Sequence, residues 1–95
     1  MKYEAMSDFE INCRVHAEVM QISGLNSFKA KDYCNNPSDA WPVIIDNHIS
    51  IECVTVNRHT FTYRAYHSAS FTKSTHENPL RAAMIVFLKM QETKK

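Results

Sequence analysis

Cys13 and His16 are the first residues whose types and spacing could do chemistry. They lie three positions apart, so on a helix both side chains would project from one face, one turn apart. A thiolate and an imidazole so placed could bind Zn²⁺, but zinc needs two further ligands, and Cys34, His48 and Cys53 supply no second close pair. Because an unligated cysteine is commonly a small buried apolar residue, we predict no metal site and no cofactor.

Cys34 is the residue that could serve as a nucleophile. A reactive thiol needs an electropositive setting and a histidine close in space. Cys34 stands just ahead of a predicted helix start at Asn36, but the five histidines are scattered without a motif, and Asp39 and Asp46 form no paired-carboxylate signature. We therefore predict a structural loop thiol and a protein that is not an enzyme, with a Cys34-dependent enzyme as the third hypothesis.

Arg81 raises a question of charge compensation. It is the third residue after Asn78, in the first turn of a predicted helix, where the positive end of the helix dipole disfavours a cation. Either an internal carboxylate, from Glu77 or Asp39, or an external anion should compensate it. We favour the internal ion pair, because structural ion pairs outnumber ligand sites.

Charge is distributed unevenly along the chain. Residues 1–52 carry eight acids against four bases, whereas residues 53–76 carry three bases and no acid, and the formal net charge of the whole chain is only +1. Cations interleaved with aromatic rings can hold single-stranded nucleic acid. This gives an alternative function, nucleic-acid binding through the acid-free hairpin; its candidate contacts are Arg58, Arg64, Tyr66 and Lys73.

The modest net charge argues against a dedicated nucleic-acid module. We therefore favour Phe61 and Tyr63 facing the core, with Arg64 and the threonines solvated. Helix, strands and helix follow in an order similar to that of a double-stranded RNA-binding domain, but the basic cluster that opens the last helix of such a domain is reduced here to Arg81.

The preferred hypothesis is a non-enzymatic protein that binds another macromolecule. Tyrosine and tryptophan are enriched at interaction hot spots, and one short segment supplies both. With Arg81, the candidate binding residues are Tyr33, Asn35, Asp39 and Trp41. The wide apolar face of the last helix additionally predicts a partner or a homo-oligomer.

Local signals place the first two helices. Ser7 and Glu10 form a capping box, and apolar residues at helical spacing predict a helix over residues 8–22 that stops at Gly24. Asn36-Pro37 has the form of a cap followed by a first-turn proline. Pro42 then predicts either two short turns or a kinked helix running to about residue 47.

In the second half of the chain, the spacing of the apolar residues changes from a helical period to every second residue. Apolar residues alternate over residues 49–66 and indicate an antiparallel hairpin, followed by a possible third strand at 67–72 and a polar loop at 73–77. Asn78-Pro79 then opens the last helix. We predict an α+β fold with an N-terminal helix, a short kinked helix, a two- to three-stranded antiparallel sheet and a C-terminal helix packed on the sheet.

Length and composition limit the fold classes and functions that the chain can have. Ninety-five residues form a single globular domain, 1–95, and 44% hydrophobic with 22% charged residues are ordinary globular values. Phosphate-cradling loops need several clustered glycines, so the lone Gly24 excludes dinucleotide folds and P-loop NTPases. An odd cysteine count without a framework spacing, no apolar run of spanning length and an acidic N-terminus predict a protein of the reducing cytoplasm, away from membranes.

Three strings of sequence carry a family resemblance: residues 6–12, 32–42 and 78–88. With residues 44–50, they resemble the NinX-like family of small proteins encoded by lambdoid phages and prophages, a domain of unknown function. The resemblance covers both terminal helices and the Trp41 region and is weakest over residues 53–76. It implies expression inside an infected or lysogenic bacterium and a dispensable accessory role, and it carries over no catalytic residue.

Overall fold

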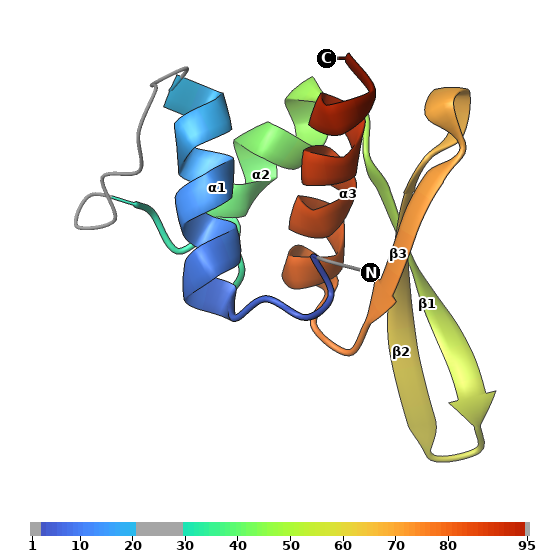
Figure 1. Ribbon diagram of the computed structural model, residues 1–95. Coiled ribbons are helices and arrows are strands. Elements are labelled where there is room, and N and C mark those ends of the chain that lie inside the picture. The colour runs from blue at the N-terminus through green and yellow to red at the C-terminus, as the bar shows by residue number, and fades with distance from the viewer. Residues whose placement is uncertain (1–2, 21–29, 95) are drawn as a thin grey trace.

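The computed structural model describes residues 3–20 and 30–94. They form three α-helices and one three-stranded antiparallel sheet, which confirms the predicted α+β class (Figure 1). The elements are α1 (Asp8–Met20), α2 (Pro37–Asp46), β1 (Ser50–Asn57), β2 (Thr60–His67), a 3-10 turn η2 (Ser68–Ser70), β3 (Thr72–His76) and α3 (Pro79–Lys94).

Helix α1 begins as its capping box predicts. The Ser7 amide donates to Glu10 Oε1 and the Glu10 amide donates to Ser7 Oγ, each at 3.1 Å. Both bonds satisfy amides that the first helical turn leaves without partners. The helix is described as far as Met20, and the predicted end at residue 22 and stop at Gly24 lie outside the described residues.

Helix α2 is one continuous helix, so the alternative of two short turns is wrong. Asn36 caps it, accepting from the Ser38 amide at 3.0 Å, and Pro37 holds the first position. Pro42 lies inside the helix and removes the amide that would bond the Ser38 carbonyl. Ser38 is exposed, so water can satisfy that carbonyl.

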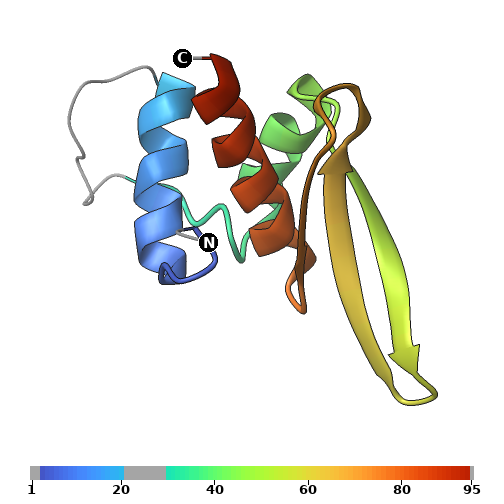
Figure 2. The same cartoon turned by 45° about the vertical axis from the view of Figure 1, so that its right-hand side comes forward.

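The sheet has the strand order β1-β2-β3, with β2 in the centre. Strands β1 and β2 form the predicted hairpin; Asn57 pairs with Thr60 across a two-residue loop, and the register shifts between Thr55 and Asn57. The hairpin extends well past the helices (Figure 2).

The third strand was predicted at the wrong place. It comprises Thr72–His76, largely the segment predicted as a loop, while residues 68–70 form a 3-10 turn. Its sequence, Thr-Lys-Ser-Thr-His, has no apolar alternation because only Ser74 faces the core. Ser74 pairs with the fully buried Ala65, and two such small side chains allow α3 to approach the sheet closely.

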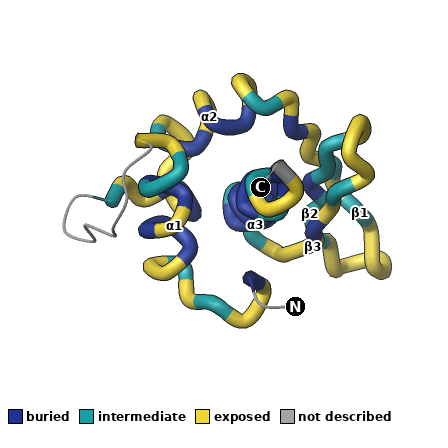
Figure 3. Tube along the Cα trace, turned by 45° about the horizontal axis from the view of Figure 1, so that its top comes forward, coloured by how far each residue is buried: buried dark blue, intermediate teal, exposed yellow. Residues whose placement is uncertain are grey.

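Helix α3 is the centre of the molecule. Residues 81–88 are all buried, because α1, α2 and the sheet pack around it (Figure 3). Ile85 and Val86, in the middle of this stretch, are both fully buried. The apolar surface that suggested a homo-oligomer is therefore covered by the chain itself.

Candidate functional site

Arg81 is 6% exposed and is held inside the molecule. Its Nη1 donates to Asp8 Oδ1 at 2.6 Å, and its Nη2 donates to the Met6 carbonyl at 2.6 Å and the Glu4 carbonyl at 3.3 Å. An internal ion pair was favoured, but the acid is Asp8 rather than Glu77 or Asp39. Arg81 is thus not accessible as a surface binding residue.

The same contacts fasten residues 3–8 to α3. Tyr3 is buried in the core, and Glu4 Oε2 accepts from Lys89 Nζ at 2.8 Å. Partial burial by itself would raise the pKa of Glu4, but the hydrogen bond and positive charge of Lys89 outweigh it, so this pKa lies below its ordinary value. The segment before α1 is therefore an integral part of the fold.

Tyr33 does not lie on the surface, which corrects the sequence-based prediction. It is 2% exposed, and its hydroxyl lies 3.2 Å from His16 Nδ1. Burial, followed by the charge of Asp39, raises the pKa of the Tyr33 hydroxyl. His16 gives the polar tip of the ring a buried partner, so a residue typical of interfaces can stand in the core.

The remaining candidates of this segment are dispersed. Asn35 donates to Asp8 Oδ2 at 3.3 Å, and Asp39 Oδ2 accepts from the Asp32 amide at 3.2 Å, so both side chains hold the loop together. Trp41 is 61% exposed on α2, close to the half-exposed Ile45 one turn further on. Trp41 is the member of the predicted cluster that presents a large surface to solvent.

The buried cysteines are placed for packing. Burial raises the pKa of the Cys34 thiol to about 12, with the charges of Asp8 and Asp32 adding to it and Arg81 opposing it, so at neutral pH the thiol is protonated. Cys13 and His16 are buried, and the Cys13 pKa is likewise raised by burial. Across residues 3–20 and 30–94, no group of three or more potential metal ligands is assembled.

Limiting iodoacetamide should therefore alkylate Cys53 first and leave Cys34 and Cys13 unmodified. Cys53 is exposed on β1, whereas the other two thiols are covered and protonated at neutral pH. Intact-protein mass spectrometry should show one adduct, which peptide mapping places on Cys53 and which Cys53→Ser abolishes. Labelling of Cys34 as fast as a model thiol would instead identify a reactive nucleophile.

The groups with no covering helix lie on the outer face of the sheet. Helix α3 packs against the face that carries Ala65 and Ser74, so side chains of the opposite parity point outward (Figures 1 and 2). Tyr66 on β2 pairs in register with Lys73 on β3, and Arg64 is two residues away on the same face. We call this surface, with Glu52 on β1 and Phe71 at its rim, the outer face.

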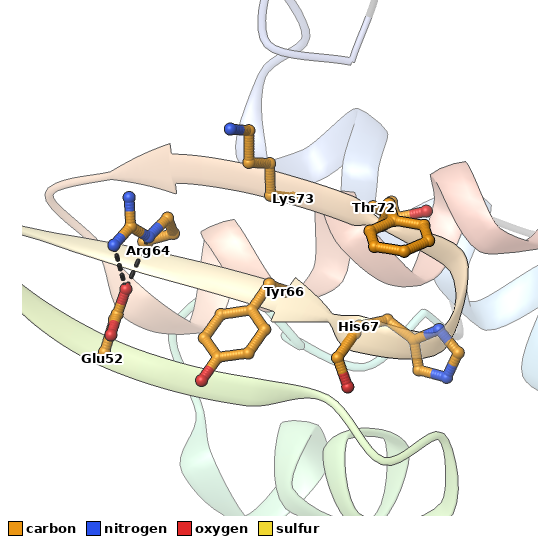
Figure 4. A pocket seen from close by; sticks show the side chains of 8 residues that line it. Glu52, Arg64, Tyr66, His67, Thr72 and Lys73 are labelled. Atoms are coloured by element: carbon orange, nitrogen blue, oxygen red, sulfur yellow. Dashed lines mark hydrogen bonds and ion pairs between the residues drawn. The ribbon is translucent and has the colours of Figure 1, made fainter.

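Glu52 and Arg64 form a cross-strand pair within the outer face. They are register partners, and Arg64 Nε donates to Glu52 Oε1 at 2.6 Å while Arg64 Nη2 contacts the same oxygen (Figure 4). Both side chains are roughly two-fifths exposed. Arg64, which lies in the acid-free segment, is thus paired with the carboxylate of Glu52, the residue just before that segment.

Phe71 stands at the rim of the outer face in an unusual conformation. It is 92% exposed, and its φ of 56° lies in the left-handed region, which costs a residue with a side chain about 1 kcal/mol. The turn that holds it is braced by hydrogen bonds between Ser70 Oγ and Thr72 Oγ1 and between Ser70 Oγ and His67 Nδ1, each 2.8 Å long. The turn therefore fixes a large ring in solvent.

Between these groups lies a groove of about 420 Å³ that Arg64, Tyr66, Phe71 and Lys73 help to line (Figure 4). Three of the four residues predicted for nucleic acid therefore come together. Arg58 does not join them, because it sits in the hairpin loop, six residues from Arg64 and about 20 Å along the strand.

Phe61 corrects the packing predicted for the hairpin. It is half exposed near the tip, while Tyr63 is only partly buried. The hairpin reaches past α3 here, so no helix is available to cover Phe61 (Figure 2).

Sequence reasoning missed two members of the outer face. Glu52 lies one residue outside the acid-free stretch, and its pairing with Arg64 follows from the hairpin register. Phe71 did not stand among the candidate contacts, because its exposure depends on the 3-10 turn. An aromatic residue directly after Ser-Ala-Ser, in a segment of small and polar side chains, was the available signal.

The fold is that of a small α+β protein whose antiparallel sheet carries helices on one face and is open on the other. The family model described as Bacteriophage P22, NinX matches residues 2–91. The chain therefore belongs to the phage NinX family. Comparison with curated proteins and with solved structures gives no match. In the part of the chain that the structure describes, no helix is both long and apolar enough to cross a membrane.

Proposed function

We propose that this phage-family protein is a non-enzymatic accessory protein that binds a host or phage macromolecule in the cytoplasm of the bacterial host, and that it does so through the outer face. The observation that carries the proposal is Phe71, whose ring is almost entirely in solvent while its backbone is held in a costly conformation. A monomeric protein gains nothing in stability from such a ring, so a contact outside the chain is the simplest reason for it.

The composition of the outer face supports recognition rather than catalysis. Tyr66 and Phe71 offer rings, Lys73 and Arg64 offer cations, and the one carboxylate among them, Glu52, is committed to Arg64. Tyrosine and arginine are among the residue types enriched at interaction hot spots. Cys34, the best nucleophile candidate of the sequence, is buried on another part of the molecule.

Trp41 and Ile45 on α2 give the second candidate surface. Both are at least half exposed and lie one helical turn apart, which suits a helix-to-groove or helix-to-helix contact. The outer face is favoured over it because it combines a groove, two rings and two cations, whereas the α2 surface is an apolar stripe.

A capture experiment with matched variants tests the proposal. Tagged wild-type protein, Phe71→Ser and Trp41→Ser are incubated with lysates of infected and uninfected host, each with and without nuclease. We expect wild type and Trp41→Ser to recover a stoichiometric partner that Phe71→Ser loses. Equal recovery by all three proteins, or no partner for any of them, contradicts the outer face as the contact surface, and selective loss in Trp41→Ser transfers the function to α2.

A further inference from the structure

We propose that the ligand of the outer face is single-stranded nucleic acid, with a base stacked on Phe71 and the neighbouring phosphates bound by Lys73 and Arg64. The inference rests on the proposed function, because it assigns a chemical class to the macromolecule bound there. It is drawn from the placement of rings and cations on one uncovered sheet surface with a groove of about 420 Å³.

The two rings of the groove provide stacking surfaces. Phe71 is 92% exposed and stands on a braced turn, so its ring is presented to solvent at a defined place on the rim. Tyr66 projects from the adjoining strand into the same groove and is partly exposed (Figure 4). Rings presented on the open face of a sheet bind bases of any sequence, since every base has a π-face.

The cations lie where a backbone beside those bases would run. Lys73 is the register partner of Tyr66 and is exposed, so the two residues lie side by side on neighbouring strands, while their side chains extend in different directions (Figure 4). Arg64 follows two residues along β2 on the same face, about 7 Å further. Arg58 continues the positive charge at the exposed hairpin loop, out of reach of the groove but accessible to a longer strand.

A single strand fits this arrangement better than a duplex does. In a duplex the bases are stacked on one another, so Phe71 and Tyr66 would find no free base surface. The helix start that double-stranded RNA-binding domains use for phosphates is also closed here, because Arg81 is buried against Asp8. An acidic protein could form ion pairs with the cations. Unlike a nucleic-acid strand, however, it does not present anions and flat rings in regular alternation.

A substitution of Glu52 tests the proposal with a variant that should bind more tightly rather than more weakly. The Glu52 carboxylate occupies Nε and Nη2 of Arg64 in the free protein, so a phosphate must displace it or share the guanidinium. Among the residues that line the groove, Glu52 is also the one acid, and it would repel a phosphate. Glu52→Gln should therefore strengthen binding several-fold.

Fluorescence anisotropy with labelled single strands of DNA and RNA of about 12 nucleotides, and with the matching duplexes, tests the inference. We expect the single strands to bind more tightly than the duplexes and binding to weaken steeply between about 50 and 200 mM salt. Phe71→Ser should weaken binding by about tenfold or more. Lys73→Ala should weaken it less but lower the salt dependence by about one counterion.

Controls separate a local effect from misfolding. Phe71, Lys73 and Glu52 are exposed or partly exposed, so each variant should keep the wild-type thermal transition, which circular dichroism measures. Trp41→Ser changes an exposed ring on α2 and should leave the affinity unchanged.

The inference is overturned if wild type does not bind single strands at low salt, if duplexes bind equally well, or if Phe71→Ser and Glu52→Gln leave the affinity unchanged. Its failure is distinct from that of the proposed function. A nuclease-resistant partner that depends on Phe71, together with flat oligonucleotide titrations, would keep the outer face as an interface and assign it to a protein.

Discussion

Replacing Arg81 with methionine should lower the free energy of unfolding by about 3 kcal/mol, measured by urea denaturation at neutral pH. The guanidinium is buried and supplies three hydrogen bonds, one to the Asp8 carboxylate and two to the carbonyls of Glu4 and Met6. Methionine fills a similar volume but donates nothing, so the segment before α1 loses its attachment to α3. Lysine cannot satisfy the same set of acceptors from one ammonium group, so Arg81→Lys should recover only part of the loss.

Two matched variants show which part of the Arg81 contact matters. Asp8→Asn removes the charge but keeps an acceptor oxygen, and the two backbone acceptors remain, so we expect a smaller loss of about 1 to 2 kcal/mol. Lys89→Met removes the ion pair with Glu4, whose cation is more exposed than Arg81, and should cost less than about 1 kcal/mol. If Arg81→Met proves no more harmful than Lys89→Met, the buried contact does not secure the N-terminal segment.

Asn78→Ala should destabilise the protein by about 2 to 3 kcal/mol, two to three times the effect of Asn36→Ala. Both residues are Asn-Pro helix caps. Asn36 accepts only from the Ser38 amide at an exposed site. The Asn78 oxygen accepts from the amides of Leu80 and Arg81, and its nitrogen donates at 2.7 Å to the carbonyl of the fully buried Cys34.

The difference between these caps comes from the Cys34 carbonyl. Alanine at position 78 leaves a buried acceptor without its donor, and this penalty adds to the loss of a cap. In Asn78→Asp, a side-chain oxygen can still accept from the amides of Leu80 and Arg81, but the side chain can no longer donate. This variant should therefore retain the helix cap and lose the hydrogen bond to the Cys34 carbonyl. Parallel urea titrations of the three variants measure the two contributions, and equal losses for Asn78→Ala and Asn36→Ala would show that the bond to Cys34 contributes nothing.

Elements with local signals could be predicted from the sequence. The capping box of Ser7 and Glu10 and the two Asn-Pro caps place the starts of all three helices within a residue. The hairpin follows from its period of two. These features depend on interactions between residues close in sequence, which is the range that a pattern can report.

Features that depend on distant residues could not be predicted in this way. Asp8 lies 73 residues before Arg81, so the nearer Glu77 was the reasonable but wrong partner. Strand β3 has one buried side chain, Ser74, and therefore no apolar alternation. The burial of Tyr33 required knowing that His16 would face its hydroxyl.

The candidate site was predicted in part and under the less favoured hypothesis. Arg64, Tyr66 and Lys73 were correctly grouped, because residues of one parity in a hairpin and its neighbouring strand share a face. The favoured set of Tyr33, Asn35, Asp39, Trp41 and Arg81 did not form one surface, since two members are buried and two brace a loop. These residues are close in sequence but do not share one solvent-exposed surface, because some of their side chains pack in the core.

The central position of α3 bears on synthesis of the protein. Helices α1 and α2 and the sheet all pack on α3, yet α3 follows every one of them in the chain. A nascent polypeptide whose residues 79–94 are still inside the ribosome has no surface on which these elements can bury their apolar faces. Folding should therefore be concerted and late, and until then the emerging hairpin and helices present exposed apolar surface that host chaperones recognise.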